Sequence, residues 1–172
     1  MGRRWHVGLL ALAIAPWAGW ASEPRVWPDP NQIDYTAVVT RVFDGDTVTL
    51  KSARAPALKA RIVGIDAPEL CQARGRESGA FLRSTLLHAT VGVRSFGRDT
   101  FGRELVVLWH GQQDVGAQLV SRGLAWAYVW KGKPSVYIEL EQQARQAKRG
   151  IFQDSQPENP RAFRKRHGPC FR

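Results

Sequence analysis

Alternating apolar and polar residues predict a set of short strands that begins near Tyr35. Residues 36–43 (TAVVTRVF) are rich in β-branched and aromatic side chains, and they end at Asp44-Gly45, a dipeptide typical of tight hairpin turns. Residues 47–50 alternate in the same way and would pair back on this first run. The strands that the pattern predicts are residues 36–43, 47–50, 58–65, 91–95 and 104–109.

Helical spacing appears in three other stretches, which are residues 77–88, 115–120 and 135–149. Asp114 is the predicted N-cap of the second helix and Gly123 closes it, while Ser135 and Gly150 have the same roles for the third. Strands interleaved with helices in this way indicate an α+β domain with a small Greek-key barrel, although a sandwich would give a similar strand count.

The 172 residues suffice for one compact domain. The first of them predict a signal peptide, because Arg3 and Arg4 precede a short apolar run and small residues precede Ser22. An uncleaved membrane anchor is the alternative. The predicted organisation is a signal peptide at 1–21, an extended leader at 22–34, a folded domain at 35–153 and a basic tail at 154–172.

The chain is basic, with 25 Lys and Arg against 15 Asp and Glu and a net charge of +10. Loss of residues 1–21, which hold two arginines and no acid, would leave +8 on the mature domain. Such a surplus favours polyanions, because a cation near a phosphate releases condensed counterions. Anionic lipid is an equally simple partner on charge alone.

The sequence has two cysteines, Cys71 and Cys170. In the oxidising compartment that export implies, we expect them to form a disulfide, and two free thiols are the alternative. None of the four histidines has the spacing of a metal site with either cysteine.

Acidic and basic residues that could carry chemistry lie in three clusters, at 44–47 (DGDT), 61–69 (RIVGIDAPE) and 98–103 (RDTFGR). Asp46 begins a predicted strand and Asp66 ends one, so neighbouring strands could bring both carboxylates to one barrel rim. Two carboxylates, a main-chain carbonyl and water suit Ca²⁺. Arg61 lies five residues before Asp66, and an odd spacing directs their side chains to opposite faces unless the strand bends.

Arg61 and Arg103 are the predicted phosphate ligands, because a guanidinium matches two phosphate oxygens and stabilises the extra charge of a five-coordinate transition state. Glu69 is the predicted proton acceptor for an attacking water. Each residue also has a purely structural interpretation: a turn at Asp44-Gly45, a surface cation at Arg103 and a loop carboxylate at Glu69. Their occurrence together in an exported basic chain favours catalysis.

These motifs resemble the staphylococcal (micrococcal) thermonuclease family from about Val38 to Phe152. The matching segments are VxDGDT (42–47), RxxGIDAPE (61–69), DxxGR (99–103), GLAWAYVW (123–130) and the helix that ends in GIF (150–152). The resemblance implies an OB-fold-type barrel of five strands with three α-helices, and cleavage of DNA or RNA to 5′-hydroxyl and 3′-phosphate ends.

The resemblance also implies residue roles. Ca²⁺ would be held by Asp46, Asp66 and the backbone carbonyl of Ala67, with Asp44 nearby as a non-ligand acid. The catalytic residues would be Arg61, Glu69 and Arg103. Phe101 departs from the family, which has a phosphate-contacting tyrosine at that position. Tyr128 and Trp130 could stack on bases, although Trp130 could equally belong to the core.

The sequence therefore predicts a secreted or periplasmic, Ca²⁺-dependent nuclease that acts as a monomer on DNA, RNA or both, with no obligate protein partner. The alternative is a non-catalytic OB-like module of the cell envelope that binds nucleic acid without cutting it. A membrane attachment would require that the N-terminal segment stays uncleaved.

Overall fold

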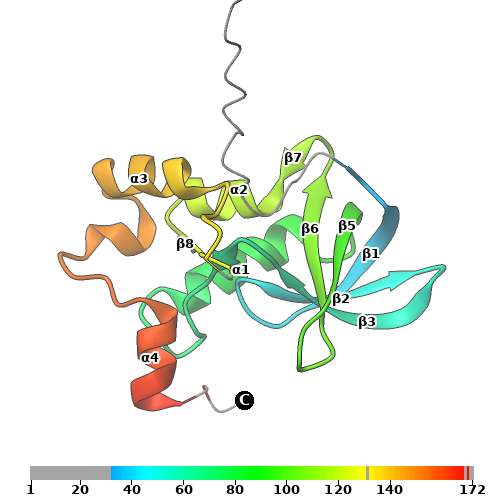
Figure 1. Cartoon of the computed structure of the whole chain (residues 1–172), viewed down its shortest axis with the longest axis horizontal. Coiled ribbons are helices and arrows are strands. Elements are labelled where there is room, and N and C mark those ends of the chain that lie inside the picture. Colours follow the sequence, from blue (N-terminus) through cyan, green and yellow to red (C-terminus); the bar gives the residue numbers. More distant parts are fainter. Residues whose placement is uncertain (1–31, 131, 169, 171–172) are drawn as a thin grey trace, which may run out of the picture.

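The computed structural model describes residues 32–130, 132–168 and 170 (Figure 1). The predicted signal peptide at 1–21 and most of the predicted leader at 22–34 lie outside these residues. No helix within the described part of the chain is long and apolar enough to cross a membrane.

A closed barrel of five strands forms the centre of the structure. The strands are β1 (Tyr35–Val42), β2 (Thr47–Ser52), β3 (Ala55–Ile62), β5 (Thr90–Arg98) and β6 (Glu104–His110). Neighbours pair antiparallel in the order β3-β2-β1-β5-β6, and a parallel pairing of β3 with β6 closes the ring. Fully buried side chains such as Val39, Val48, Ile62 and Leu108 fill the interior. The α+β barrel is thus confirmed, and the sandwich is excluded.

Three further strands have two residues each: β4 (Ile65–Asp66), β7 (Gln113–Asp114) and β8 (Trp126–Ala127). β4 pairs with β8 outside the barrel. The predicted strand 58–65 is shifted, because β3 starts at Ala55 and stops at Ile62. Gly64 follows with a φ of 75°, a conformation that glycine adopts at little cost, and the chain turns there before β4 begins.

The predicted helices correspond to α1 (Gly75–Leu86), α2 (Val115–Ser121) and α3 (Ile138–Gln146), with a 3₁₀ turn, η1 (Gly150–Gln153), after α3. Asp114 caps α2 as predicted, since its side chain accepts a hydrogen bond from the backbone of Ala117 at 3.1 Å. The cap predicted at Ser135 is wrong. The Ser135 hydroxyl donates to the Gly64 carbonyl at 2.8 Å, and α3 starts only at Ile138.

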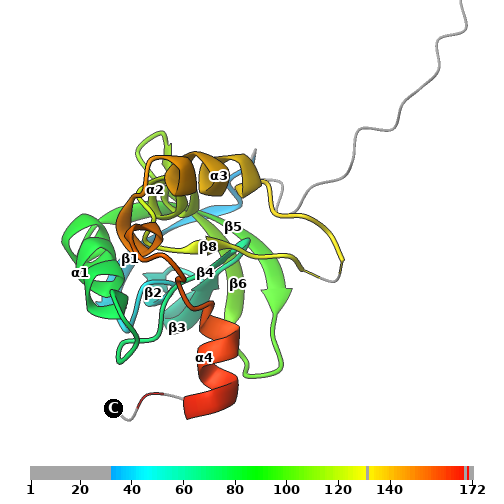
Figure 2. The same ribbon diagram turned by 90° about the vertical axis from the view of Figure 1, so that its left-hand side faces the viewer.

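A fourth helix, α4 (Pro160–His167), corrects the prediction of three α-helices and lies inside the predicted tail. The Asn159 side chain caps it by accepting from the backbone of Arg161 at 2.9 Å, and Pro160 occupies its first turn. In both views α4 stands on the side of the molecule away from α3 (Figures 1 and 2). The predicted disulfide is confirmed: Cys71 and Cys170 are bonded and tie the chain beyond α4 to the loop before α1.

Candidate functional site

Two nearly buried aspartates lie where β2 begins and where β4 ends, and we call them the rim aspartates. Asp46 is 4% exposed and Asp66 is 1% exposed. The backbone carbonyl of Asp46 accepts from the Ile62 amide at 2.8 Å, which fixes the start of β2 against the end of β3. A carboxylate removed from water in this way requires charged or hydrogen-bonding partners.

Arg61 at the end of β3 joins the rim aspartates. Its Nη1 lies 2.7 Å from Asp46 Oδ1, and its Nη2 lies 2.8 Å from Asp66 Oδ1. The odd spacing between Arg61 and Asp66 is accommodated because the chain turns at Gly64 between the two strands. Burial acts to lower the pKa of the Arg61 guanidinium, but the charges of Asp46 and Asp66 outweigh it and raise that pKa above its usual range.

Asp44 lies beside the rim aspartates, in the turn between β1 and β2, where its Oδ1 accepts from the Asp46 amide at 3.2 Å. Burial, and then the charge of Asp46, raises the pKa of Asp44 to about 6. The turn packs so closely that a Cβ on Gly45 would lie 1.9 Å from Ser78 Oγ of α1. Only glycine fits this position, so Gly45 is required for the close packing of the turn against α1 as well as for the turn itself.

Ala67 is buried directly after β4, and its amide donates to Asp46 Oδ2 at 3.1 Å. The chain that carries the predicted carbonyl ligand therefore runs past Asp46. Within the described residues, no group of three or more His, Cys, Asp or Glu side chains forms a metal cluster. The available donors are the two rim carboxylates and backbone oxygen, a hard-oxygen set that fits Ca²⁺ and does not suit a thiophilic metal.

Glu69 lies in the loop between β4 and α1, held by Gln72. The Gln72 side chain accepts from the Glu69 amide at 3.1 Å and donates to the Glu158 carbonyl at 2.6 Å. The loop then turns tightly into α1, where a Cβ on Gly75 would lie 1.7 Å from the Glu69 carbonyl oxygen. Sequence reasoning had missed Gln72, because a lone glutamine gives no signal of its partners.

Arg164 of α4 is a further residue of this network that sequence reasoning missed. Its Nη1 lies 2.9 Å from Glu69 Oε1 and 3.2 Å from Asp66 Oδ1, and its Nη2 lies 3.0 Å from Asp66 Oδ2. The sequence does contain helix signals here, because Asn159-Pro160 before the basic run is typical of a helix N-terminus and Gly168 after it is typical of a helix end. The charge of the run, taken alone, predicts only a basic tail.

Arg103 precedes β6 and contacts none of the rim aspartates. Its Nε donates to Asp99 Oδ2 at 2.8 Å, in the turn between β5 and β6. Burial acts to raise the pKa of Asp99, but the hydrogen bonds from Arg103 outweigh it, so that pKa lies below its usual value. Arg61 pairs with Leu105 across the parallel strands, and Arg103 lies two residues before Leu105. The alternation of side chains thus places both arginines on the same outer face of the barrel.

Aromatic residues lie on that outer face. Trp130 packs against the small hydrophobic cluster of Val63, Leu105 and Val107. This contact agrees with the alternative prediction that Trp130 contributes to hydrophobic packing. The ring centroids of Tyr128 and Trp130 are 6.5 Å apart. The Phe101 side chain is 82% exposed on the turn, with the Arg103 guanidinium 5.4 Å from its ring centroid.

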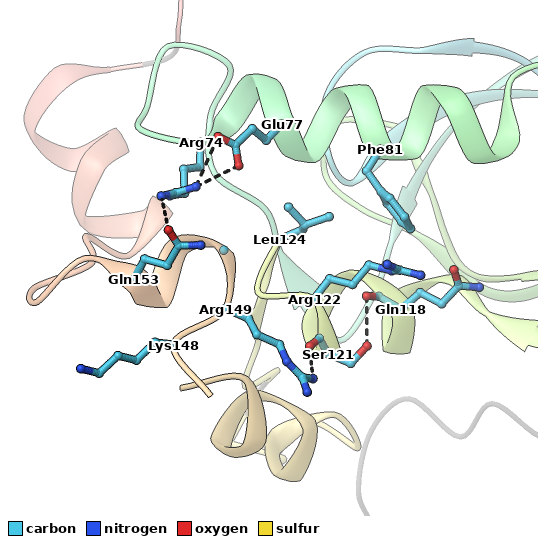
Figure 3. Close-up of a pocket in the computed structure, with 11 residues that line it drawn as sticks. Arg74, Glu77, Phe81, Gln118, Ser121, Arg122, Leu124, Lys148, Arg149 and Gln153 are labelled. Carbon is cyan, nitrogen blue, oxygen red and sulfur yellow. Dashed lines mark hydrogen bonds and ion pairs between the residues drawn. The ribbon is translucent and has the colours of Figure 1, made fainter. Parts of the chain in front are cut away.

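A separate cavity of about 710 Å³ lies between α1, α2 and η1 (Figure 3). None of the predicted site residues lines it. Two of its cations have local partners: Arg74 pairs with Glu77 at 3.1 Å, and the Arg122 guanidinium lies 5.0 Å from the Phe81 ring centroid. The predicted site residues lie elsewhere, at the barrel rim and in the loops and turns beside it.

The sequence of the chain is similar to those of known nucleases and endonucleases. The family described as "Staphylococcal nuclease homologue" matches residues 59–154. An "Uncharacterized endonuclease" of Escherichia coli O157:H7 is 38% identical over 129 residues, which are 74% of this chain and 84% of that protein. An "Uncharacterized endonuclease" of Haemophilus influenzae is 30% identical over 130 residues, 76% of this chain and 73% of that protein. A "Micrococcal nuclease" of Shigella flexneri is 31% identical over 147 residues, covering 79% and 84%.

Proposed function

The chain belongs to the family of staphylococcal nuclease homologues, which makes it a nuclease, and on this premise we propose an exported, Ca²⁺-dependent enzyme that cuts DNA, RNA or both. One observation supports the catalytic part most strongly. Two nearly buried aspartates are bridged by Arg61, and Arg164 links one of them, Asp66, to the loop glutamate Glu69, so that all five side chains form one hydrogen-bonded network at the barrel rim. A domain that only binds nucleic acid has no need to bury two carboxylates at such a cost.

Asp46, Asp66 and the carbonyl of Ala67 would hold Ca²⁺, which when bound supplies positive charge beside the phosphodiester. Arg61 and Arg103, on one outer face, would bind the phosphate oxygens and stabilise the charge that develops on them. Glu69 would take a proton from the attacking water. The new P–O bond forms as the bond to the 5′ oxygen breaks, and that oxygen takes up a proton, which leaves 5′-hydroxyl and 3′-phosphate ends.

The disulfide between Cys71 and Cys170 supports export, because such bonds persist mainly in oxidising compartments. The basic surplus of the chain supports a nucleic-acid substrate. Tyr128 and Trp130 would offer ring faces to bases at the edge of the site.

The test is cleavage of plasmid DNA and of a long RNA by the purified protein, in Ca²⁺ and in EGTA. We expect cleavage in Ca²⁺ only, with ends that polynucleotide kinase labels without prior phosphatase treatment. Arg103→Ala should lower turnover by about 10²-fold or more, as loss of a donor to a developing charge does. Arg98→Ala removes an exposed arginine from the same turn and should stay close to wild type. Intact DNA and RNA in Ca²⁺ would leave a binding module as the better description.

A further inference from the structure

The tail that contains α4 is attached to the Glu69 loop at three places. The Gln72 side chain donates to the Glu158 carbonyl, the Cys71–Cys170 disulfide joins loop and tail, and Arg164 reaches Glu69 itself. These attachments join residues 86 to 99 positions apart in the sequence. Contacts of such separation hold α4 against the candidate site, so the tail is more than a solvated extension of the domain.

The contact of Arg164 with Asp66 concerns the atoms that a cation would need. Oδ2 of Asp66 accepts from Arg164 at 3.0 Å, while Oδ1 accepts from both Arg61 and Arg164. Both oxygens of an aspartate that is 1% exposed are therefore bonded to guanidinium groups. These bonds occupy three of the four lone pairs of the carboxylate, so a cation that binds Oδ1, or that binds both oxygens, has to displace a guanidinium donor.

Arg164 is the donor that can leave. Arg61 is fixed by the ladder of β3, and its side chain bridges both rim aspartates. Arg164 comes from a helix of eight residues, and its side chain is 35% exposed, so it can turn to water without disturbing the barrel. Its guanidinium keeps its charge throughout the physiological range. Competition by Arg164 therefore does not depend on pH.

Resting on the function proposed above, we propose that Arg164 is a further residue of the site, one that competes with the divalent cation for Asp66 while it also pairs with Glu69. Removal of Arg164 then raises the affinity of the site for the cation. The disulfide keeps the local concentration of the Arg164 guanidinium high, because it tethers the chain three residues beyond α4 to Cys71, two residues from Glu69. The concentration of Ca²⁺ at which the site fills is thus set in part by the tail.

Direct binding of Ca²⁺ to the full chain, measured by isothermal titration calorimetry without substrate, tests this assignment. Arg164→Gln should lower the Kd for Ca²⁺ by about tenfold, the low end of the range expected when a competing charged hydrogen bond is removed. Lys165→Gln is the matched control, because it removes one exposed positive charge from the same helix. Its Kd should change less than twofold. An unchanged or higher Kd in Arg164→Gln would overturn the proposal.

The tether is tested by the double variant Cys71→Ser/Cys170→Ser, after thermal unfolding has established that it is folded. We expect a lower Kd than in the wild type, and a much smaller further effect when Arg164→Gln is added, because both changes relieve the same competition. Independent effects of equal size would contradict the role given to the tether. If no chain, including the wild type, binds Ca²⁺, then the Ca²⁺ dependence proposed above fails together with this inference. If all bind it equally, only the inference fails.

Discussion

The candidate site draws on two regions that are built differently. The barrel rim, formed by the ends of β2, β3 and β4, holds Asp46, Asp66 and Arg61 through backbone strand pairing, of β2 with β3 and of β4 with β8. The loop–tail region, which we define as residues 67–74 and 154–168, holds Glu69 and Arg164 through side-chain bonds and a disulfide. The rim aspartates are almost inaccessible to water, whereas the side chains of Glu69 and Arg164 are 23% and 35% exposed.

This difference matches two chemical tasks. Groups that hold a cation and a phosphate must keep fixed spacings, and a closed barrel provides them. A group that takes a proton from water and passes it on needs access to solvent, which a surface loop provides. We therefore expect changes in the rim to lower stability as well as turnover, and changes in the loop–tail region to lower turnover with little effect on stability.

The largest effect is expected for Glu69→Gln. Loss of a general base should lower kcat by about 10³-fold. Stability should change by less than about 1 kcal/mol, because the pair of Glu69 with Arg164 is partly exposed. Initial rates on plasmid DNA and thermal unfolding of the same preparations measure both quantities. Glu77→Gln, an exposed carboxylate change in α1, is the control and should retain the wild-type rate. A large fall in unfolding temperature in Glu69→Gln would remove the distinction between the two regions.

Arg61→Ala should have the next largest effect, this time on stability. It leaves two nearly buried aspartates without their common partner, which costs about 3 kcal/mol in metal-free buffer. Ca²⁺ should restore part of this loss by binding only the folded state. Arg103→Ala is the comparison, because Asp99 keeps its bonds from the amides of Phe101 and Arg103, and the cost should be about 1 kcal/mol or less. Urea unfolding in EGTA and in Ca²⁺ measures the difference. Equal losses in the two variants would show that the rim does not depend on its buried charges in the way we describe.

The rim could be predicted from the sequence because its information is local. Hydrophobic alternation located the five long strands, and the dipeptide Asp44-Gly45 marked the turn between β1 and β2, although not the register shift between Val39 and Arg41. The family motifs then marked Asp46, Arg61 and Asp66 at the ends of those strands. The bend at Gly64 could not be predicted, because a single glycine in the sequence does not indicate in which direction the chain turns.

The loop–tail region could not be predicted in the same way. Its contacts join residues almost 100 positions apart, and neither Gln72 nor Arg164 belongs to a periodic pattern. Two-residue strands such as β4 and β8 are likewise too short to produce one. The cysteine pair was predicted from chemistry, but the position of the helix it tethers depends on tertiary contacts. The residue whose role we now add, Arg164, came from this region.

The charge on the rim should also appear in the pH dependence of stability, through Asp44. Burial and the charge of Asp46 raise the pKa of Asp44 from 3.8 to about 6 in the folded protein. Because the unfolded chain loses this proton at lower pH, folding becomes less favourable as pH rises from about 4 to 6, and the cost persists above that range. Asp44→Asn cannot ionise, so in metal-free buffer it should match the wild type near pH 4 and exceed it by about 2 kcal/mol at pH 7. Urea unfolding at the two pH values checks the sign, and a constant difference between the two proteins would contradict it.

The smallest effect is expected at the turn between β5 and β6, which belongs to neither region. Phe101 is 82% exposed there, so Phe101→Tyr adds a hydroxyl without disturbing any packing. If that hydroxyl reaches a substrate phosphate, as the family resemblance implies, one hydrogen bond should lower KM about threefold and leave kcat unchanged. Phe81→Tyr places the same hydroxyl in the separate cavity of Figure 3 and should leave KM as it is. Steady-state kinetics on single-stranded DNA distinguishes these outcomes. A change in kcat at Phe101 would mean that the side chain at this position affects the chemical step itself, in addition to the role that we propose for Arg103 of the same turn.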